Sequence, residues 1–565
     1  MPEKSTNPFV AFVRFMWRAL DFSRRFVLNM IFLLIVVIIL AAIAGGMPKL
    51  EPKTALLLAP RGDIVEQYTA NAADRALAKM FGDEVREVQL RDILRSLDAA
   101  AKDPAIDRVV LVPDEISSAG MSTLLEIGAA LDRFRESGKE VIAYSDAMDQ
   151  RGYLLAAHAD KVYLHPDGAI LLEGIGRYRT YFKSAFDKLG VEARLFRVGE
   201  YKSAGEPYIR NDQSPEAREA DLFWMGDLWQ RYLAEVAKLR KLDAAKLEAS
   251  ILAYDTAVPA AGGDLAKLAK EQGLVDELKT RDEVRRMLIE KGAEDDEHSF
   301  RHVDLDDYAQ RAAALDVGFG KPKLAVVVAE GEIVDGEGQP GTIGGDTTAM
   351  LLRKAREDDG VKAVVLRVDS PGGSVFPSEI IRREVELTRK AGKPVVVSMG
   401  DVAASGGYWI SMNADTIVAS PSTITGSIGI FGLWFNAPQA MDKLGLNTDG
   451  VGTTWISGAV DPRRPYDERL GKVIQSVIDR GYQQFIGNVA KAREKSTDEI
   501  DAIARGRVWS GAQAKERGLV DQLGTFQDAI ALAAKKAKLE DYHLQYIERE
   551  LSPFEALMVD MSSSV

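Results

Sequence analysis

The chain contains no cysteine among its 565 residues. It therefore forms no disulfide bond, has no thiolate nucleophile and offers no cysteine-based zinc site. Histidine is also scarce: there are five, and none has the H-E-x-x-H spacing of a zinc peptidase. His298 and His302 are four residues apart in a polar, acidic stretch, so we interpret them as a solvated pair rather than a metal site.

The sequence also lacks any block of lysine and arginine. Its formal net charge of −13 argues against nucleic acid as a partner. The hydrophobic content of 46% and charged content of 28% are those of a globular protein. A chain of this length is too long for one core, so we expect two or more domains.

A long uncharged segment lies near the start of the chain. Residues 26–44 contain no charged side chain, and this is about the length that crosses a bilayer. The flank before it is basic, so we expect residues 1–25 in the cytoplasm, a single-pass anchor over 26–46 and the rest of the chain outside the cytoplasm. A cleaved signal peptide is the alternative, because residues 42–44 match the small-residue cleavage pattern. The apolar run and the segment before it are both long for a signal peptide.

Short motifs recur in the same order at a nearly constant shift. Gly152-Tyr153 returns as Gly407-Tyr408, 255 positions later, and the sequence KEQGLVD from Lys270 returns as KERGLVD from Lys515. Ordered recurrence of this kind indicates an internal duplication. We expect the following parts: a first copy over residues 52–310, a second copy over 320–540, an acidic linker at 290–307 between them, and a tail over 541–565.

Within each copy, short apolar runs alternate with helical patterns. In the second copy this predicts three strands and a helix between the last two: residues 324–329, 364–368 and 395–399, and 377–391. Strands separated by helices imply parallel βαβ units. The predicted fold class is therefore α/β, with two tandem βαβ repeats after a single N-terminal transmembrane helix.

Two glycine-bearing turns follow strands of the second copy. Ser405 lies in the run AASGG, where its hydroxyl has room and Gly406 lets a backbone amide approach a reacting carbonyl oxygen. The earlier turn is DSPGGS, residues 369–374. The pair is consistent with a nucleophile and an oxyanion hole, although either turn alone is equally consistent with an ordinary βα connection.

The aligned copies divide the reactive residues between them. Opposite the serine, the two glycines and a further serine, Ser427, the first copy has Gln150, Ser117-Ser118 and Leu172. No histidine precedes His543 in the second copy, so a Ser–His–Asp triad is hard to assemble. Lysine is the other neutral base, once burial lowers its pKa. The candidate is Lys202 in the first copy, opposite Ser457 in the second.

Four motifs in order resemble one known family. They are YKSAGEP, DSPGGS, AASGGY and SPSTITGSIG, which begin at residues 201, 369, 403 and 420. These motifs are similar to those of the signal peptide peptidase A family in its long tandem form, also called protease IV. The resemblance covers essentially the whole chain, including the expected anchor.

This resemblance implies a Clp/crotonase-like fold and a Ser/Lys dyad. In the family pattern Ser405 is the nucleophile, Lys202 the general base, and Ser427 the residue that hydrogen-bonds the lysine. The amides of Gly373 and Gly406 form the oxyanion hole. The resemblance also implies a homotetramer tethered to the bacterial inner membrane, with the catalytic part in the periplasm, and it implies no cofactor or metal.

The predicted function is that of a membrane-anchored serine endopeptidase. Its expected substrates are cleaved signal peptides and other hydrophobic peptides, and the apolar run 428–435 is either a groove wall for an extended peptide or a buried strand. One alternative, a crotonase-like acyl-transfer enzyme, needs a carboxylate acid/base instead of the dyad. The other, a catalytically inactive membrane scaffold, has no reason to keep Ser405 and Lys202 in opposite copies.

Overall fold

A computed structural model describes residues 49–562 except 82–85, 316–317 and 319, together with 12, 15–18, 20–30 and 32–33. The chain divides into two compact units, Met1–Pro52 and Lys53–Val565. In the first unit, residues 20–30 are helical. The anchor expected over 26–46 lies largely outside the described residues, and within those that are described no helix has the length and apolar character needed to cross a bilayer.

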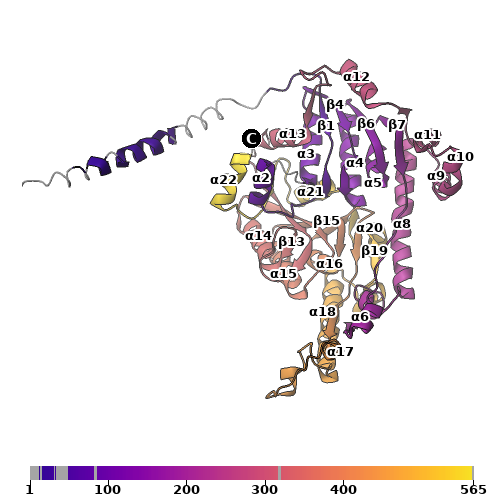
Figure 1. The fold of residues 1–565 in the computed structure, drawn as a ribbon, viewed down its shortest axis with the longest axis vertical. Coiled ribbons are helices and arrows are strands. Elements are labelled where there is room, and N and C mark those ends of the chain that lie inside the picture. The colour runs from indigo at the N-terminus through magenta and orange to yellow at the C-terminus, as the bar shows by residue number, and fades with distance from the viewer. Residues whose placement is uncertain are drawn as a thin grey trace, which may run out of the picture. The chain divides into compact units, whose positions relative to one another are not determined.

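The first copy is built on a parallel sheet of six strands, of which Figure 1 labels β1, β4, β6 and β7. Its strand order is β10-β1-β4-β6-β7-β9. The strands are β1 (Thr54–Leu58), β4 (Ile106–Leu111), β6 (Glu140–Asp149), β7 (Lys161–Leu171), β9 (Glu277–Leu278) and β10 (His302–Asp304). Strand β10 pairs with β1 at one edge, so the stretch that we expected to be a linker contributes a strand to this sheet.

The second copy repeats the same plan. Its main strand order is β21-β11-β14-β15-β17-β19, with β16 paired to β15 and β20 to β16. The strands are β11 (Lys323–Glu330), β14 (Val361–Ser370), β15 (Val395–Ala404), β16 (Thr416–Ala419), β17 (Ile424–Gly426), β19 (Val508–Ser510), β20 (Gln522–Leu523) and β21 (His543–Tyr546). Strand β21 lies beside β11 as β10 lies beside β1, so the expected tail at 541–565 begins with a strand of this sheet. The shared strand order fits the duplication seen in the sequence.

Helices connect and cover both sheets (Figure 1). In the first copy they are α2 (Ala72–Phe81), α3 (Leu90–Ala100), α4 (Met121–Glu136), α5 (Gln150–Ala156), α6 (Lys183–Leu189), α7 (Glu206–Ile209), α8 (Pro215–Arg240), α9 (Ala244–Leu252), α10 (Tyr254–Ala260), α11 (Leu265–Glu271), α12 (Arg281–Lys291) and α13 (Leu305–Leu315). In the second they are α14 (Gly345–Glu357), α15 (Val375–Lys390), α16 (Gly406–Ser411), α17 (Pro438–Lys443), α18 (Glu468–Ala492), α19 (Thr497–Ile503), α20 (Gly511–Glu516), α21 (Phe526–Lys536) and α22 (Pro553–Ser562). The described residues also form the short strands β2 (Gly62–Val65), β3 (Glu87–Gln89), β5 (Ile116–Ser118), β12 (Glu332–Val334) and β13 (Thr342–Gly344).

The central strands of the second copy are buried on both faces. The six inner residues of β11, Leu324 to Ala329, are buried, as a strand between two helical layers requires. The long helix α18 turns Tyr482 and Phe485 into this core and leaves Val473 and Val477 exposed. Burying each large apolar side chain contributes roughly 1.5–3 kcal/mol to folding.

A strand of the first copy pairs directly with a strand of the second. Strand β8 (Glu192–Arg197) runs antiparallel to β18 (Phe431–Asn436), with Arg197 opposite Phe431. Through this pairing, a segment of the first copy packs against the second copy. The loop that follows β8 therefore lies beside the glycine-bearing turns.

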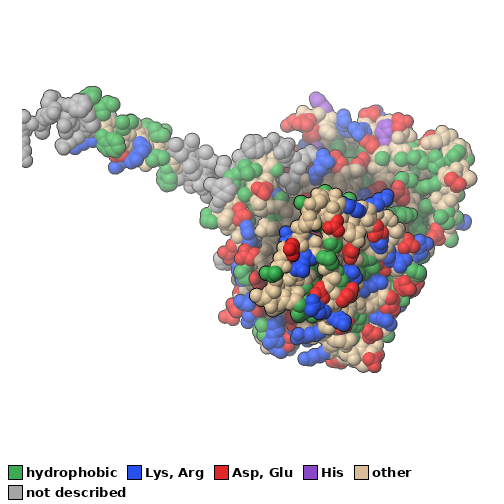
Figure 2. All heavy atoms as spheres, turned by 60° about the horizontal axis from the view of Figure 1, so that its bottom comes forward, with side chains coloured by type: hydrophobic (Ala, Val, Ile, Leu, Met, Phe, Trp, Pro, Cys, Tyr) green, Lys and Arg blue, Asp and Glu red, His purple; other side chains and the backbone are tan. Residues whose placement is uncertain are grey.

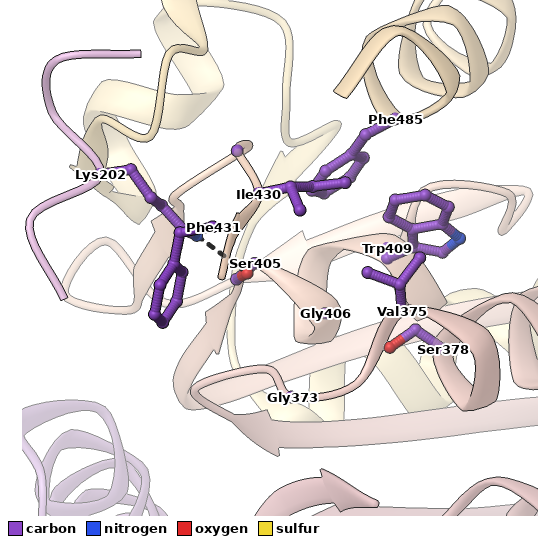
Figure 3. Close-up of a pocket in the computed structure, with 11 residues that line it drawn as sticks. Lys202, Gly373, Val375, Ser378, Ser405, Gly406, Trp409, Ile430, Phe431 and Phe485 are labelled. Carbon is purple, nitrogen blue, oxygen red and sulfur yellow. Dashed lines mark hydrogen bonds between the residues drawn. The ribbon is translucent and has the colours of Figure 1, made fainter. Parts of the chain in front are cut away.

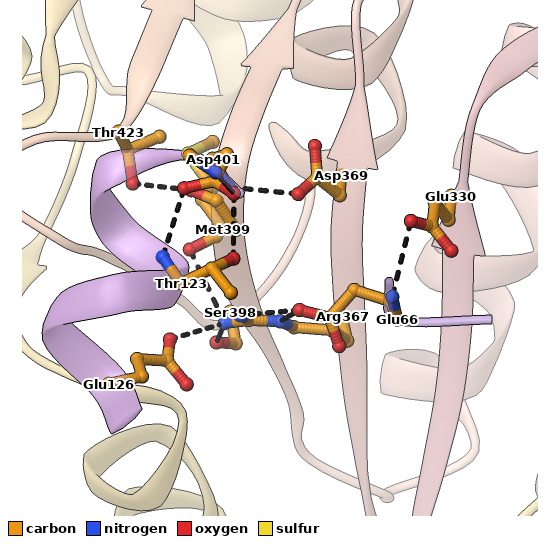
Figure 4. A network of polar contacts seen from close by, with 12 residues as sticks. Glu66, Thr123, Glu126, Glu330, Arg367, Asp369, Ser398, Met399, Asp401 and Thr423 are labelled. Carbon is orange, nitrogen blue, oxygen red and sulfur yellow. Dashed lines mark hydrogen bonds and ion pairs between the residues drawn. The ribbon is translucent and has the colours of Figure 1, made fainter. Parts of the chain in front are cut away.

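A buried charge network also joins the copies (Figure 4). Arg367 on β14 is fully buried, and its guanidinium donates to Glu66 at 2.7 Å and to Glu126 at 2.9 Å. Both glutamates belong to the first copy. Burial raises the pKa of Glu126 to about 7, while Arg367 opposes this rise. Because a buried charge without its partner costs several kcal/mol, each copy completes the interior of the other.

The surface carries both signs of charge. On the face shown in Figure 2, basic and acidic side chains are interspersed rather than gathered into a patch of one sign. Below α17 in Figure 1, an arm projects from the second copy. Large apolar side chains of this arm are exposed: Leu444, Leu446, Val451, Trp455, Ile456 and Val460.

Candidate active site

Ser405 occupies a sharp bend between a strand and a helix. Strand β15 ends at Ala404 and α16 begins at Gly406, and Ser405 between them has φ 55° and ψ −114°. Positive φ is uncommon for a residue with a side chain and is typical of strained functional turns. The amide of Ser405 donates to the Gly426 carbonyl at 2.9 Å, which fixes the bend against β17. The strain is thus held by the sheet, and it presents the hydroxyl at the strand end.

The second glycine-bearing turn packs against this bend. A Cβ on Gly372 would lie 2.7 Å from the Gly406 nitrogen and 2.8 Å from the Ser405 Cβ. A Cβ on Gly406 would lie 3.1 Å from the Gly373 nitrogen. Only glycine permits this close approach at position 372. The amides of Gly373 and Gly406 consequently border the same small space next to the Ser405 hydroxyl.

Lys202 reaches this serine from the first copy (Figure 3). It lies in the loop between β8 and α7, and its Nζ is 3.0 Å from Ser405 Oγ. The same Nζ lies 2.8 Å from the Ser427 carbonyl oxygen and 3.0 Å from Ser427 Oγ. Lys202 is 5% exposed, and desolvation by burial lowers its pKa to about 7.

The lysine loop is braced from both copies. Arg197 donates to the Lys202 carbonyl at 2.8 Å, and the Tyr201 amide donates to the Arg505 carbonyl at 3.2 Å. Gly506 comes so close that a Cβ there would lie 2.5 Å from the Lys202 nitrogen. These contacts leave little freedom in the backbone that carries the amine.

The hydrogen-bonding capacity of a neutral amine matches its surroundings. A neutral lysine has two N–H donors and one lone pair. The carbonyl and hydroxyl oxygens of Ser427 can accept the two donors, which leaves the lone pair for the Ser405 hydroxyl proton. The arrangement therefore suits a base that takes the proton of Ser405.

A cavity of about 60 Å³ opens beside Ser405 (Figure 3). Apart from the dyad and the glycines, its wall consists of Val375, Ser378, Trp409, Ile430, Phe431 and Phe485. The rings of Trp409 and Phe485 pack with centroids 4.4 Å apart, and Trp409 Nε1 donates to Glu379 at 2.9 Å. The cavity thus combines a wall of mostly apolar side chains with a hydroxyl, an amine and two amides.

The structure brings together all five residues that the sequence singled out, namely Ser405, Lys202, Ser427, Gly373 and Gly406. The sequence reasoning missed the pocket walls Val375, Trp409 and Phe485. Trp409 directly follows the AASGGY motif, which was the one available signal. The apolar run 428–435 is not a buried strand throughout: Ile428 and Ile430 are buried, whereas Phe431 to Phe435 in β18 are partly exposed, and Ile430 and Phe431 line the pocket. Its role as the wall of a groove for an extended peptide stays a prediction.

The equivalent positions of the other copy make ordinary structural contacts. The Gln150 side chain donates to the Gly174 carbonyl and accepts from the Gly174 amide, both at 3.0 Å. Ser457, opposite Lys202, lies in a short 3₁₀ helix and contacts Thr454. Within the described part of the chain, no three histidine or acidic side chains are placed to hold a metal ion.

A serine beside a buried amine and two converging amides, on an α/β scaffold, defines a serine hydrolase. A model of peptidase family S49 matches residues 133–294 and 388–540. Protease 4 of Salmonella typhi is 42% identical over 563 residues, which cover 98% of this chain and 90% of that one. Protease 4 of Haemophilus influenzae is 38% identical over 531 residues, 92% of this chain and 85% of that one. The chain belongs to peptidase family S49 and is a serine peptidase.

Among solved structures, a ClpP1 mutant from Listeria monocytogenes is similar in part. The match has 16% sequence identity and a TM-score of 0.24, and it covers 36% of this chain and 94% of that chain.

Proposed function

We propose that the chain is an endopeptidase with a Ser/Lys dyad, in which Lys202 of the first copy is the general base for Ser405 of the second. The single observation that carries the proposal is the 3.0 Å contact between the Lys202 amine and the Ser405 hydroxyl. A lysine acts as a base only when it is neutral, and burial that lowers its pKa to about 7 makes the neutral form abundant at physiological pH.

The mechanism follows from these positions. Neutral Lys202 takes the proton of Ser405 Oγ as this oxygen attacks the peptide carbonyl carbon. The amides of Gly373 and Gly406 stabilise the resulting oxyanion. Lys202 then gives its proton to the leaving amine, and an acyl-enzyme forms at Ser405. Water, activated by the neutral lysine, hydrolyses this ester in the second half of the cycle.

The pocket supports hydrophobic peptides as substrates. Trp409, Ile430 and Phe485 offer apolar contact to a substrate side chain next to the scissile bond. An extended peptide added along residues 428–435 would bring its carbonyl to Ser405, with backbone hydrogen bonds supplying affinity and the pocket supplying preference. Spent signal peptides are apolar and extended when unfolded, so they fit this chemistry.

A crotonase-like activity fits less well. Such chemistry needs a carboxylate near the paired amides, and none of the described residues that line the cavity is aspartate or glutamate. A catalytically inactive scaffold would not need a buried lysine whose pKa is lowered beside a strained serine.

Location and assembly form a further part of the proposal. The uncharged run at 26–44 after a basic flank supports a single-pass anchor over 26–46 in a bacterial inner membrane, with the catalytic part in the periplasm. The exposed apolar side chains of the 444–460 arm support self-association, and the proposed state is a homotetramer. Protease added to spheroplasts should digest residues 52–565. Protection of that region until the inner membrane is broken would overturn the orientation.

The activity is tested with the full-length chain in detergent micelles. Wild type should cleave an apolar peptide, and a fluorophosphonate probe should label Ser405. Peptide mapping by mass spectrometry would identify the labelled residue. Ser405→Ala should lose both signals, while the matched variant Ser411→Ala, at a buried serine in α16, should keep both. Undiminished cleavage by Ser405→Ala would refute the proposal.

A further inference from the structure

The Asp369 side chain lies between the two turns of the site, and the mechanism above gives it no role. Strands β14 and β15 pair in register up to Val368 opposite Met399, and pair again at Ser370 opposite Ala403. Between these two pairs, Asp369 alone faces three residues of β15. This is a β-bulge, and bulges free backbone donors from the ladder and redirect the strand.

The Asp369 carboxylate satisfies the donors that the bulge frees. Its Oδ2 accepts from the Asp401 amide at 3.0 Å, and its Oδ1 accepts from the Val402 amide at 3.2 Å (Figure 4). The Asp369 backbone carbonyl accepts from the Gly331 amide at 2.9 Å. The Asp369 side chain thus replaces the backbone hydrogen bonds that are missing between the two strands at the bulge.

Both turns of the active site start at this bulge. The chain leaves Asp369 for Gly373, whose amide borders the oxyanion space, and it leaves Val402 for Ser405. A change in the spacing of the strands at the bulge would therefore move the Ser405 hydroxyl relative to the Gly373 amide. Displacements of about 1 Å in such an arrangement cost catalysis roughly 100-fold.

The brace continues into the first copy through Asp401. The Asp401 carboxylate accepts from the amides of Gly120 and Thr123, both at 3.0 Å, and from the Thr123 hydroxyl at 2.6 Å. These donors lie at the start of α4, as Figure 4 shows. The bulge next to the nucleophile is thereby fixed to the copy that supplies Lys202.

The first copy contains the same device without an active site. At the shift of 255 positions, Asp114 and Asp146 stand opposite Asp369 and Asp401, and the Asp146 amide donates to Asp114 Oδ2 at 2.9 Å. The Asp146 side chain, however, contacts Tyr144 and Arg281 within its own copy. A structural role of the aspartate is therefore common to both copies, whereas a role in catalysis is confined to the second.

We infer that Asp369 is a positioning residue for the acylation step: its carboxylate braces the bulge that sets the Ser405 hydroxyl against the Gly373 amide. The inference rests on the proposed Ser/Lys peptidase. Asp369 touches no reacting atom and acts through the two turns that follow the bulge.

The test compares Asp369→Asn with its matched control, Asp114→Asn. An asparagine keeps one acceptor oxygen but places an NH₂ group against the second backbone donor, which is Val402 in the second copy and Ala147 in the first. One hydrogen bond is therefore lost in either copy. Asp369→Asn should lower kcat by roughly 10- to 100-fold with KM nearly unchanged. It should slow fluorophosphonate labelling of Ser405 by a similar factor. Asp114→Asn should leave both rates within about twofold of wild type. Its melting temperature should fall by about as much as that of Asp369→Asn.

A second variant displaces the carboxylate without altering it. A Cβ on Gly400 would lie 2.7 Å from Asp369 Oδ2, so Gly400→Ala should push this oxygen off the Asp401 amide and should reproduce the loss of kcat. This variant also decides the matter if Asp369→Asn fails to fold. Full kcat in Gly400→Ala, or equal losses of kcat in Asp369→Asn and Asp114→Asn, would overturn the inference. Failure of the proposed function looks different, because Ser405→Ala would then cleave peptide as well as wild type does.

Discussion

The Lys202 amine lies 3.0 Å from the Ser405 hydroxyl although 203 positions of sequence separate the two residues. The two partners lie in different copies of the duplication. Gln150 stands opposite the serine and Ser457 opposite the lysine, so each copy carries only one of the pair. The pairing of β8 with β18 then returns the lysine loop of the first copy to the serine of the second.

The buried lysine should make the protein less stable at neutral pH than at high pH. Burial lowers the Lys202 pKa from 10.5 to about 7, so between these values the unfolded chain binds more protons than the folded one. The free energy of unfolding attributable to this group therefore rises with pH across that window. Lys202→Met should melt above wild type at pH 7, and the difference should shrink towards pH 10. Calorimetry checks this, with the exposed Lys238→Met as control. Equal melting temperatures of wild type and Lys202→Met at pH 7 would contradict it.

Ser427→Ala should impair turnover without weakening substrate binding. The substitution removes one of the two acceptors that orient the neutral amine, whose correct placement is worth roughly 100-fold or more in general-base catalysis. We expect kcat to fall by about 10-fold or more, with KM unchanged, since Ser427 is absent from the pocket wall. The control is Ser422→Ala, a buried serine in the same segment. A change confined to KM would show that Ser427 acts on substrate rather than on Lys202.

Val375→Phe should narrow the range of accepted substrates. Val375 stands at the start of α15, 38% exposed, and its side chain borders the pocket, so the larger ring can enter the cavity without disturbing the core. For peptides with a bulky apolar residue before the scissile bond, kcat/KM should fall roughly 10-fold or more, while peptides with alanine there should be cut almost as before. Val473→Phe, on an exposed face of α18, should alter neither. Equal effects on both peptides would place the substrate side chain elsewhere.

Arg367→Met should destabilise the protein by weakening the contact between its two copies. It leaves Glu66 and Glu126 buried without their cation, which costs about 3–5 kcal/mol for such a network. Burial already raises the pKa of Glu126 to about 7, so its protonation at pH 5.5 removes much of the uncompensated charge. The loss of stability in urea should therefore be larger at pH 8 than at pH 5.5. Lys354→Met, at an ion pair with Glu550 that is exposed on both sides, should show no such difference. A loss that is the same at both pH values would rule out this electrostatic explanation.

Much of the scaffold could be predicted from local sequence. The apolar runs at 324–329, 364–368 and 395–399 lie within β11, β14 and β15, because buried parallel strands need continuous apolar segments. Strand β10 was not foreseen. Its three residues, His302 to Asp304, are partly exposed at a sheet edge and have no apolar pattern, so the pairing with β1 alone defines them.

Some residues of the site could likewise be predicted from the sequence, and others could not. Ser405 and the glycines could be located because the residues that form a turn are adjacent in the sequence. Lys202 could be located because the two copies could be compared. Trp409 and Phe485 come together only through packing of α16 on α18. Asp369 stood in a motif from the start, but its contacts depend on a bulge between two strands, which no local pattern reveals.

The pH dependence of acylation tests the central claim most directly, namely that Lys202 of one copy is the base for Ser405 of the other. The rate of fluorophosphonate labelling of Ser405 should rise with pH through about 7, because only the neutral amine accepts the serine proton. Lys202→Arg should abolish labelling at every pH up to 10, since a guanidinium stays protonated. Labelling of Lys202→Arg at the wild-type rate, with the same rise near pH 7, would show that another group is the base.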